Sequence, residues 1–301
     1  MKIVFLGTGG MVPTKDRNVQ STYLEYRGEG ILMDCGEGTQ RQMNLAGINR
    51  IKVRKILISH WHGDHVAGLI GLVQTLGNID QPGTVKLYGP EGTKDYLDHM
   101  LKCCSFDMRL DLQVQEIRPE DDEPVTFFEN DRYELQAVRL RHSTPCLGYA
   151  FVEKDQRNIS MAKAKGYGLE EGPALGRLQK GETVEKDGNT IRPDDVSTIK
   201  KGRKVSFALD TEPCPGLNNL ARDADVFIAE ATYESSLDEK AEEYKHLTAQ
   251  VVAQVASQEN VKRLYLTHFS QRYKTPEKLE EDARKVFPDT VCAYDFLQVK
   301  L

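Results

Sequence analysis

A dense group of histidines and one carboxylate interrupts the chain between two apolar runs, and this group most limits what the chain can fold into. Residues 56–71 read Ile-Leu-Ile-Ser-His-Trp-His-Gly-Asp-His-Val-Ala-Gly-Leu-Ile-Gly, so three of the seven histidines fall within six positions. A strand that ends at Ser59 places His60 and His62 on one side of an extended segment, because strand side chains alternate. The pattern therefore predicts a strand that delivers two imidazoles to one point.

The ligand chemistry of the group favours a metal site. Past the bend at Gly63, the side chains of Asp64 and His65 can face a second point in space. Neutral imidazole and carboxylate suit Zn²⁺ or Mn²⁺, and open coordination positions leave room for a reactive water. The alternative is a group of core or surface histidines, in which each buried imidazole would need its own polar partner in a low dielectric.

The composition is that of a globular protein with one large domain or two modest ones. A chain of 301 residues with 39% hydrophobic content can bury a sizeable core. No apolar run approaches the about 20 residues of a membrane span, so we expect no membrane partner. Six scattered cysteines without a CxxC pair fit a reduced cytoplasm. A formal charge of −6 argues against a general nucleic-acid coat but permits a local basic site.

Periodicity predicts a chain of alternating strands and helices. Strands are expected at residues 1–6, 21–26, 30–34, 53–59, 85–88, 112–117, 125–128, 133–140, 148–153, 204–209, 226–229 and 263–266, followed by two terminal strands. Helices are expected at residues 39–46, 65–76, 217–222 and 248–257, and one more begins at Pro276.

Periodicity fails between residues 154 and 203, where glycines, prolines and charges predominate. This inserted segment is too long for an ordinary loop in a compact domain, so it is functional or extended. Residues 154–180 carry six Lys or Arg residues against three Asp or Glu residues. On charge alone, a solvated loop explains that excess better than a binding site does.

Further possible ligands stand at the ends of distant strands: His142, Asp210 and His268. A fold that gathers strand ends at one sheet edge can bring them to the histidine group. This predicts a dinuclear centre with two Zn²⁺ per subunit, Mn²⁺ or another divalent ion being the alternative. One ion would be held by His60, His62 and His142, the other by Asp64, His65 and His268, with Asp210 between them.

The His-x-His-x-Asp-His motif, followed in order by His142, Asp210 and His268, resembles the metallo-β-lactamase superfamily. The resemblance covers nearly the whole chain and implies one α/β domain over residues 1–301. Its architecture would be an αββα sandwich with the metal site at its edge and a protruding arm insertion. Hydrolases of lactams, thioesters and phosphodiesters share this fold with redox enzymes, so the superfamily leaves function open.

Four narrower motifs resemble the ribonuclease Z family, endonucleases that trim the 3′ trailer from precursor tRNA. They are Pro13-x-Lys15-x-Arg17-Asn18, Asp34-Cys35-Gly36-Glu37-Gly38, Gly172-Pro173-Ala174-Leu175-Gly176-Arg177 and Thr267-His268-Phe269-Ser270-x-Arg272-Tyr273. The resemblance implies that Asp34 supports the metal loop from behind the ligands. It implies a flexible tRNA-binding arm at about residues 154–180, and substrate contacts from Lys15, Arg17, Asn18, Gly172, Pro173 and Arg177.

The same resemblance implies a mechanism. Asp64 would help to position a metal-activated water for attack on the scissile phosphorus, and Arg272 would absorb charge on the phosphoryl oxygens. His246, backed by Glu230, would protonate the leaving 3′-oxygen; taken alone, His246 is better explained as a helix-start histidine. The products would be a 3′-hydroxyl on the tRNA and a 5′-phosphate on the trailer, made by a cytoplasmic homodimer in which each arm holds tRNA for the partner's site.

Three residues depart from the pattern common in that family. Ala229 and Leu247 stand where histidine and serine are frequent, and Arg141 stands where aspartate is frequent. One rival interpretation is a general phosphodiesterase on the same scaffold, which would be expected to lack the arm and the loop at residues 13–18. A second rival interpretation is a noncatalytic RNA-binding protein, which would not need the full set of metal-binding side chains. A flavin-linked diiron enzyme would need a further domain, for which the chain has no room.

Overall fold

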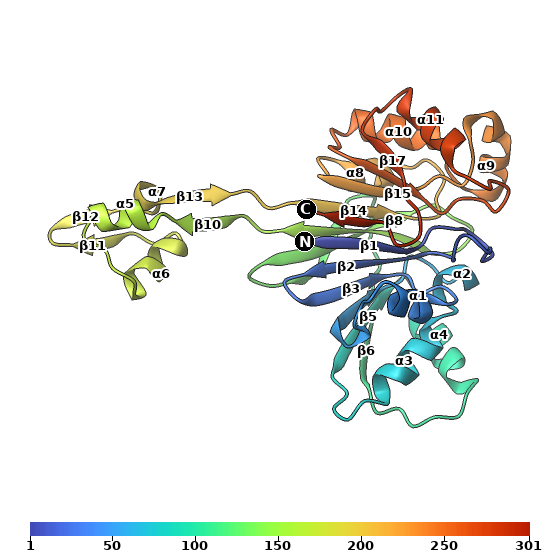
Figure 1. The fold of residues 1–301 in the computed structure, drawn as a ribbon, viewed down its shortest axis with the longest axis horizontal. Helices are drawn as coiled ribbons and strands as arrows, with labels where there is room; N and C mark the ends of the chain where they lie inside the picture. The colour runs from blue at the N-terminus through green and yellow to red at the C-terminus, as the bar shows by residue number, and fades with distance from the viewer.

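Two seven-stranded sheets lie face to face in the computed structural model, which describes residues 1–301 (Figure 1). In spatial order, the first sheet consists of β18 (Gln298–Lys300), β1 (Lys2–Gly7), β2 (Ser21–Tyr26), β3 (Glu29–Met33), β4 (Val53–Leu57), β5 (Thr84–Gly89) and β6 (Asp111–Glu116). The second consists of β17 (Thr290–Cys292), β16 (Leu264–Thr267), β15 (Val226–Glu230), β14 (Lys204–Ala208), β9 (Cys146–Glu153), β8 (Tyr133–Leu140) and β7 (Val125–Glu129).

Alternation along the strands builds three apolar layers. On β9, Tyr149 and Phe151 pack between the sheets, whereas Ala150 packs against the helices outside the second sheet. The helices that cover the second sheet are α8 (Pro215–Ala221), α10 (Ala249–Gln258) and α11 (Glu277–Arg284), and those on the first sheet are α1 (Thr39–Leu45), α3 (Leu69–Gly77) and α4 (Thr93–Lys102) (Figure 1). The expected αββα sandwich is therefore confirmed.

Four further short helical elements complete the sandwich. They are η1 (Arg50–Lys52), α2 (Gly63–Val66), η2 (Ser235–Leu237) and α9 (Asp238–Tyr244). No helix of the structure combines the length and the apolar character that crossing a membrane requires.

The helix expected at residues 65–76 is instead two helices, α2 and α3, separated at Ala67 and Gly68. The Gly68 amide donates to the Cys35 carbonyl at 2.8 Å, and a Cβ at Gly68 would lie 2.2 Å from the Gly36 carbonyl oxygen. The backbone contacts of Gly68 thus connect the loop after β3 to the segment that carries Asp64 and His65. Apolar periodicity cannot reveal such a backbone contact.

The segment in which the sequence periodicity fails, residues 154–203, forms an arm that projects from one end of the sandwich (Figure 1). Its stalk is the antiparallel pair β10 (Gln156–Ile159) and β13 (Ser197–Lys200). The tip contains α5 (Met161–Gly166), α6 (Pro173–Gln179), β11 (Val184–Lys186), β12 (Asn189–Ile191) and α7 (Pro193–Val196). The tip has its own small core, made of Ala164, Leu169, Leu175, Leu178, Val184, Ile191 and Val196. This projecting unit continues past Lys180 to the end of β13.

Candidate metal centre

Three side chains enter the site from strand ends at which the backbone turns sharply. Asp34 follows β3, Asp210 follows β14 and His268 follows β16, and their φ angles are 55°, 47° and 58°. A positive φ is strained for residues other than glycine, and such strain concentrates at functional sites. These three turns bring the side chains to one edge of the sandwich.

The first ligand group gathers His60, His62, His142 and one oxygen of Asp210. His60 Nε2 lies 3.0 Å from His62 Nδ1, and His142 Nε2 lies 3.3 Å from the same His62 atom. Asp210 Oδ2 lies 3.6 Å from His60 Nε2 and 3.9 Å from His142 Nε2. The four ligand atoms lie within 4.8 Å of one another, as one shared ion requires.

The second ligand group gathers Asp64, His65, His268 and the other oxygen of Asp210. His65 Nε2 lies 3.2 Å from His268 Nε2, and Asp64 Oδ2 lies 3.5 and 3.3 Å from these two nitrogens. Asp210 Oδ1 lies 3.5 Å from His65 Nε2 and 3.2 Å from His268 Nε2. Asp210 therefore presents one carboxylate oxygen to each histidine group.

The electrostatics of the site fit a divalent cation. Asp210 Oδ1 is buried and has no hydrogen-bond partner, which is costly for a carboxylate oxygen. Burial raises the pKa of Asp210, but His268 and His65 outweigh burial and hold it well below its usual value. Burial lowers the pKa of His60, which favours the neutral imidazole that binds metal. A buried carboxylate among imidazole nitrogens is suited to a metal ion.

Several groups outside the two ligand sets orient the ligands. The Asp34 carboxylate contacts His65 Nδ1 at 2.7 Å and accepts hydrogen bonds from the Ser59 amide and hydroxyl, each at 2.7 Å. The backbone carbonyl of Lys245 lies 3.1 Å from His142 Nδ1. These contacts leave the Nε2 atoms of His65 and His142 facing the site. The sequence indicated Asp34 by its motif, but a backbone carbonyl such as that of Lys245 carries no sequence signal.

His246 and Glu230 form a buried pair beside the ligand groups. His246 Nδ1 lies 3.0 Å from Glu230 Oε1, whose side chain is fully buried. The Thr232 hydroxyl donates to Glu230 Oε2 at 2.6 Å, and the Thr211 amide donates to Glu230 Oε1 at 2.7 Å. Burial lowers the pKa of His246, but the Glu230 carboxylate outweighs burial and raises it to about 9. Neither Thr232 nor Thr211 was predicted from the sequence to support this pair.

The three departures from the family pattern leave this geometry intact. Ala229 and Leu247 are buried in the apolar layer beneath the site, so neither side chain interrupts the His246 and Glu230 contact. Arg141 donates its amide to Thr211 Oγ1 at 3.1 Å and accepts the Glu212 amide at 2.8 Å through its carbonyl. Backbone hydrogen bonds therefore position the residue before His142, and the Arg141 side chain remains exposed.

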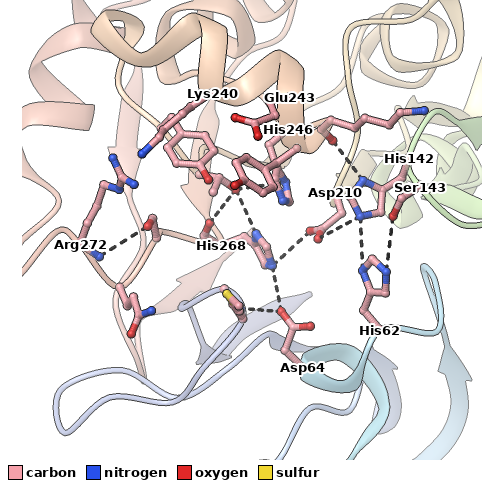
Figure 2. A pocket seen from close by; sticks show the side chains of 18 of the residues that line it. His62, Asp64, His142, Ser143, Asp210, Lys240, Glu243, His246, His268 and Arg272 are labelled. Carbon is pink, nitrogen blue, oxygen red and sulfur yellow. Dashed lines mark hydrogen bonds and ion pairs between the residues drawn. The ribbon is translucent and has the colours of Figure 1, made fainter.

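Figure 2 shows the open cavity above the ligands, with His62, Asp64, His142, Asp210, His246 and His268 around it. Its volume is about 1090 Å³, and Lys240, Glu243 and Arg272 also line it. The Arg272 guanidinium lies 5.2 Å from the centre of the Tyr233 ring, a cation–π arrangement that holds it at the cavity. The cavity has room for a phosphodiester and its neighbouring nucleotides.

Two residues of the loop at 13–18, both predicted as substrate contacts, make contacts within the protein. Arg17 is buried, donates to the Tyr273 carbonyl and lies 5.7 Å from the Phe269 ring centre. Asn18 donates both amide hydrogens to backbone carbonyls, at 2.7 Å to Glu37 and at 3.3 Å to Val19. These contacts fix the loop to the rest of the site. Lys15 alone among the predicted contacts of this loop is fully solvated.

The predicted substrate residues of the arm belong to α6 and its start, and Figure 1 shows α6 at the opposite end of the molecule from α2, which carries Asp64 and His65. Gly172 and Pro173 begin α6, where proline at the first helical turn is favourable. Arg177 donates to Glu182 at 2.9 Å within the arm, so its charge is partly neutralised. Lys163, Lys165 and Lys180 are exposed, and no ion pair involves them.

Proteins named ribonuclease Z are similar to this chain in sequence over nearly its whole length. The ribonuclease Z of Methanothermobacter thermautotrophicus is 41% identical over 302 residues, which cover 100% of this chain and 97% of that protein. The ribonuclease Z of Bacillus licheniformis is 40% identical over 306 residues, covering 99% of this chain and 98% of that protein. A family model described as anti-Pycsar protein Apyc1 matches residues 1–161.

Solved structures give the same fold. The crystal structure of the short form of human tRNase Z has a TM-score of 0.74 and 27% identity, covering 100% of this chain and 99% of that chain. The metallo-β-lactamase fold protein YhfI from Bacillus subtilis has a TM-score of 0.70 at 15% identity, which shows the fold alone, over 99% of this chain and 98% of that one. By its full-length relatives and its site geometry, the chain belongs to the ribonuclease Z family of metal-dependent endoribonucleases in the metallo-β-lactamase superfamily.

Proposed function

We propose that this chain removes the 3′ trailer of precursor tRNA in a zinc-dependent hydrolysis that leaves a 3′-hydroxyl on the tRNA and a 5′-phosphate on the trailer. The observation that carries the proposal is the placement of an ionised Asp210 between two imidazole groups, with the His246 and Glu230 pair beside them. Full-length relatives named ribonuclease Z support the choice of substrate.

Two Zn²⁺ ions per subunit are the proposed cofactors. His60, His62 and His142 would hold one ion, Asp64, His65 and His268 the other, and Asp210 would touch both. When bound, such a pair acidifies water and neutralises charge on a phosphate. Nitrogen and carboxylate donors in these numbers suit Zn²⁺, and Mn²⁺ is the next candidate.

Asp64 and Arg272 would position the reacting groups. The Met11 amide donates to Asp64 Oδ2 at 2.7 Å, which fixes the carboxylate at the cavity wall, where it can orient the attacking water. Arg272 lines the same cavity and carries a charge that can stabilise the negative phosphoryl oxygens. The attack then needs no 2′-hydroxyl nucleophile.

His246 would give the proton that the leaving 3′-oxygen needs. Its Nδ1 faces Glu230, so Nε2 is the atom free to serve the substrate. Because Glu230 raises the pKa of His246 to about 9, the imidazole carries a proton at neutral pH. A positioned general acid of this kind contributes about 10²- to 10⁴-fold to the rate.

The arm would hold the tRNA body, and the shape of the molecule favours a homodimer. Figure 1 places α2, which carries Asp64 and His65, at the end of the sandwich away from the arm. An arm at that end is better placed to hold a substrate for the site of a second subunit than for its own. Lys163, Lys165 and Lys180 would contact phosphates, which positions RNA without reading sequence.

The proposal is tested with purified protein, precursor tRNA and mature CCA-ended tRNA. The full chain is compared with an armless variant, in which a short Gly/Ser linker replaces residues 156–200. A short linker can close this gap because Gln156 and Lys200 are paired neighbours, and the sandwich core lies outside the range. We expect the full chain to cleave the precursor near the end of the acceptor stem. The armless variant should lose at least about 100-fold on tRNA and keep its activity on bis(p-nitrophenyl) phosphate. Equal losses on both substrates would refute the role of the arm, and an uncut precursor would refute the function.

A further inference from the structure

Met11 combines two unfavourable features at the edge of the active-site cavity. Its φ angle is 68°, in the left-handed region that favours glycine, and its side chain is 76% exposed. An exposed apolar side chain on a strained backbone is not explained by the stability of the fold. Such residues are retained where the strain or the side chain serves a function.

The backbone at Met11 is held in place by the site itself. Its amide donates to Asp64 Oδ2 at 2.7 Å, and the preceding Gly10 donates to the Phe269 carbonyl at 3.1 Å. Gly10 lies so close to His268 that a Cβ there would be 2.6 Å from the imidazole Cε1. The loop therefore crosses directly over one ligand and binds another.

These contacts explain the conformation but not the side chain. A glycine at position 11 would adopt the same φ without strain and would donate the same amide to Asp64. Other positive-φ residues of the site have assigned contacts: Asp34, Asp210 and His268 through their side chains, and Lys245 through its carbonyl. Among these residues, Met11 is the one whose exposed side chain at the cavity edge is apolar.

The cavity has a few large side chains with apolar surface. Its lining is mainly charged and polar, and its large apolar side chains are Met11, Tyr233 and Tyr244. Tyr233 is almost buried and lies under Arg272, so Met11, at 76% exposed, and Tyr244, at 52% exposed, are the apolar side chains with free surface. A nucleotide whose phosphate sits among the ligands needs a place for the flat face of its base, and a flexible thioether packs well against an aromatic ring.

We infer that the Met11 side chain is a packing surface for the nucleobase next to the scissile phosphate, and so helps to position the RNA. Since the ligand is taken to be RNA, this inference rests on the proposed function. Met11 acts here through the substrate base and takes no part in bond making. Removal of the side chain should lower kcat/KM for substrates that carry this base and leave kcat/KM unchanged for substrates that lack it.

The test compares Met11→Gly, Met11→Leu and a control, Met108→Gly, which removes an exposed methionine outside the cavity. Each protein is assayed on a precursor tRNA and on two matched precursors with an abasic site, one on each side of the cleavage point. Thermal unfolding is measured in parallel. Met11→Gly relieves the strain, so its unfolding midpoint should not fall, which separates lost binding from lost folding.

We expect Met11→Gly to lower kcat/KM on the intact precursor by about two- to tenfold, with most of the change in KM. On the precursor abasic at the contacted base, Met11→Gly and the unsubstituted protein should be equal. Met11→Leu should recover most of the loss, and Met108→Gly should show none. Equal losses on all three precursors, or no loss on any, would contradict the inference alone. Failure of the unsubstituted protein to cut any precursor would instead contradict the proposed function, and the inference with it.

Discussion

His65 and His268 are 203 positions apart in the chain, yet their Nε2 atoms lie 3.2 Å apart. Neither nitrogen can hydrogen bond to the other unless one of them is protonated, and Asp210 and Asp64 oxygens face both. Burial lowers the pKa of His65, but the carboxylates of Asp210 and Asp34 outweigh burial and raise it well above its usual value. The site thus attracts positive charge, and a divalent ion satisfies all these ligands at once.

Metal binding should stabilise the folded chain. An ion held at about 1,000 times its dissociation constant adds about 4 kcal/mol to the free energy of unfolding. We expect chelation to lower the thermal midpoint by several degrees and Zn²⁺ to restore it. Elemental analysis of the stable form should give two metal ions per chain. A midpoint that is the same with chelator and with Zn²⁺ would contradict the assignment of the ligands.

Asp210→Asn tests the residue between the two groups. The amide keeps the size of the carboxylate but lacks its charge, so both ions should bind more weakly. We expect a fall in bound metal and a loss of cleavage of at least about 100-fold. Asp131→Asn, at an exposed loop position, is the matched control and should bind metal and cleave normally. Full metal content in Asp210→Asn would show that this carboxylate is not shared.

Glu230→Gln and His246→Asn test the proton donor. Both should retain metal, because neither residue belongs to the two proposed ligand groups. We expect kcat on precursor tRNA to fall about 10²- to 10⁴-fold, with KM changed little. A substrate with a better leaving group, such as bis(p-nitrophenyl) phosphate, should lose much less. Similar losses on both substrates would mean that the pair maintains the structure of the site and does not protonate the leaving group.

The exposed lysines of the arm should account for part of the salt dependence of tRNA binding. Replacing Lys163, Lys165 and Lys180 with glutamine removes three cations that have no ion-pair partner. We expect a loss of about 10- to 100-fold in tRNA affinity and a shallower slope of log affinity against log salt. Lys154→Gln is the control, since Lys154 pairs with Glu129 at 2.5 Å. An unchanged slope in the triple variant would exclude these lysines as phosphate contacts.

The base of the arm should respond to acid through Glu153. Burial raises the pKa of Glu153, but hydrogen bonds from Arg203 at 2.8 Å and Tyr26 at 2.9 Å outweigh burial and lower it. A lowered carboxyl pKa contributes stability that is present above its ordinary value of 4.5 and is lost as the pH falls through the folded value. Glu153→Gln should therefore destabilise the protein at pH 7 and much less at about pH 3. Denaturant titrations of both proteins at these two pH values measure the difference, and an equal deficit at both would contradict it.

Strand alternation is a local signal, so the sequence predicted most strands of the two sheets. The sandwich itself was predicted from the resemblance of the His-x-His-x-Asp-His motif to the metallo-β-lactamase superfamily. The sequence did not predict the internal structure of the arm, whose elements are short and share a core of only seven buried side chains. The helix α9 was missed as well, because its sequence is mostly charged. A charged helix lacks the apolar period on which such predictions rest.

Within the site, side chains were easier to predict than backbone. The motif at residues 13–18 predicted a loop that contacts substrate, but not that Arg17 and Asn18 bind this loop to the rest of the protein. The positive φ of Asp34, Asp210 and His268, and the carbonyl of Lys245 on His142, depend on how distant strands meet. No single stretch of sequence carries that information.

The most direct test of the account is to map the ends that the protein makes from a precursor tRNA, with and without a chelator. We predict one metal-dependent cut that leaves a tRNA ending in a 3′-hydroxyl and a trailer beginning with a 5′-phosphate, and no cut by a folded His65→Ala variant. A 2′,3′-cyclic phosphate on the tRNA, or the same cut in the presence of chelator, would contradict the proposed metal-dependent hydrolysis.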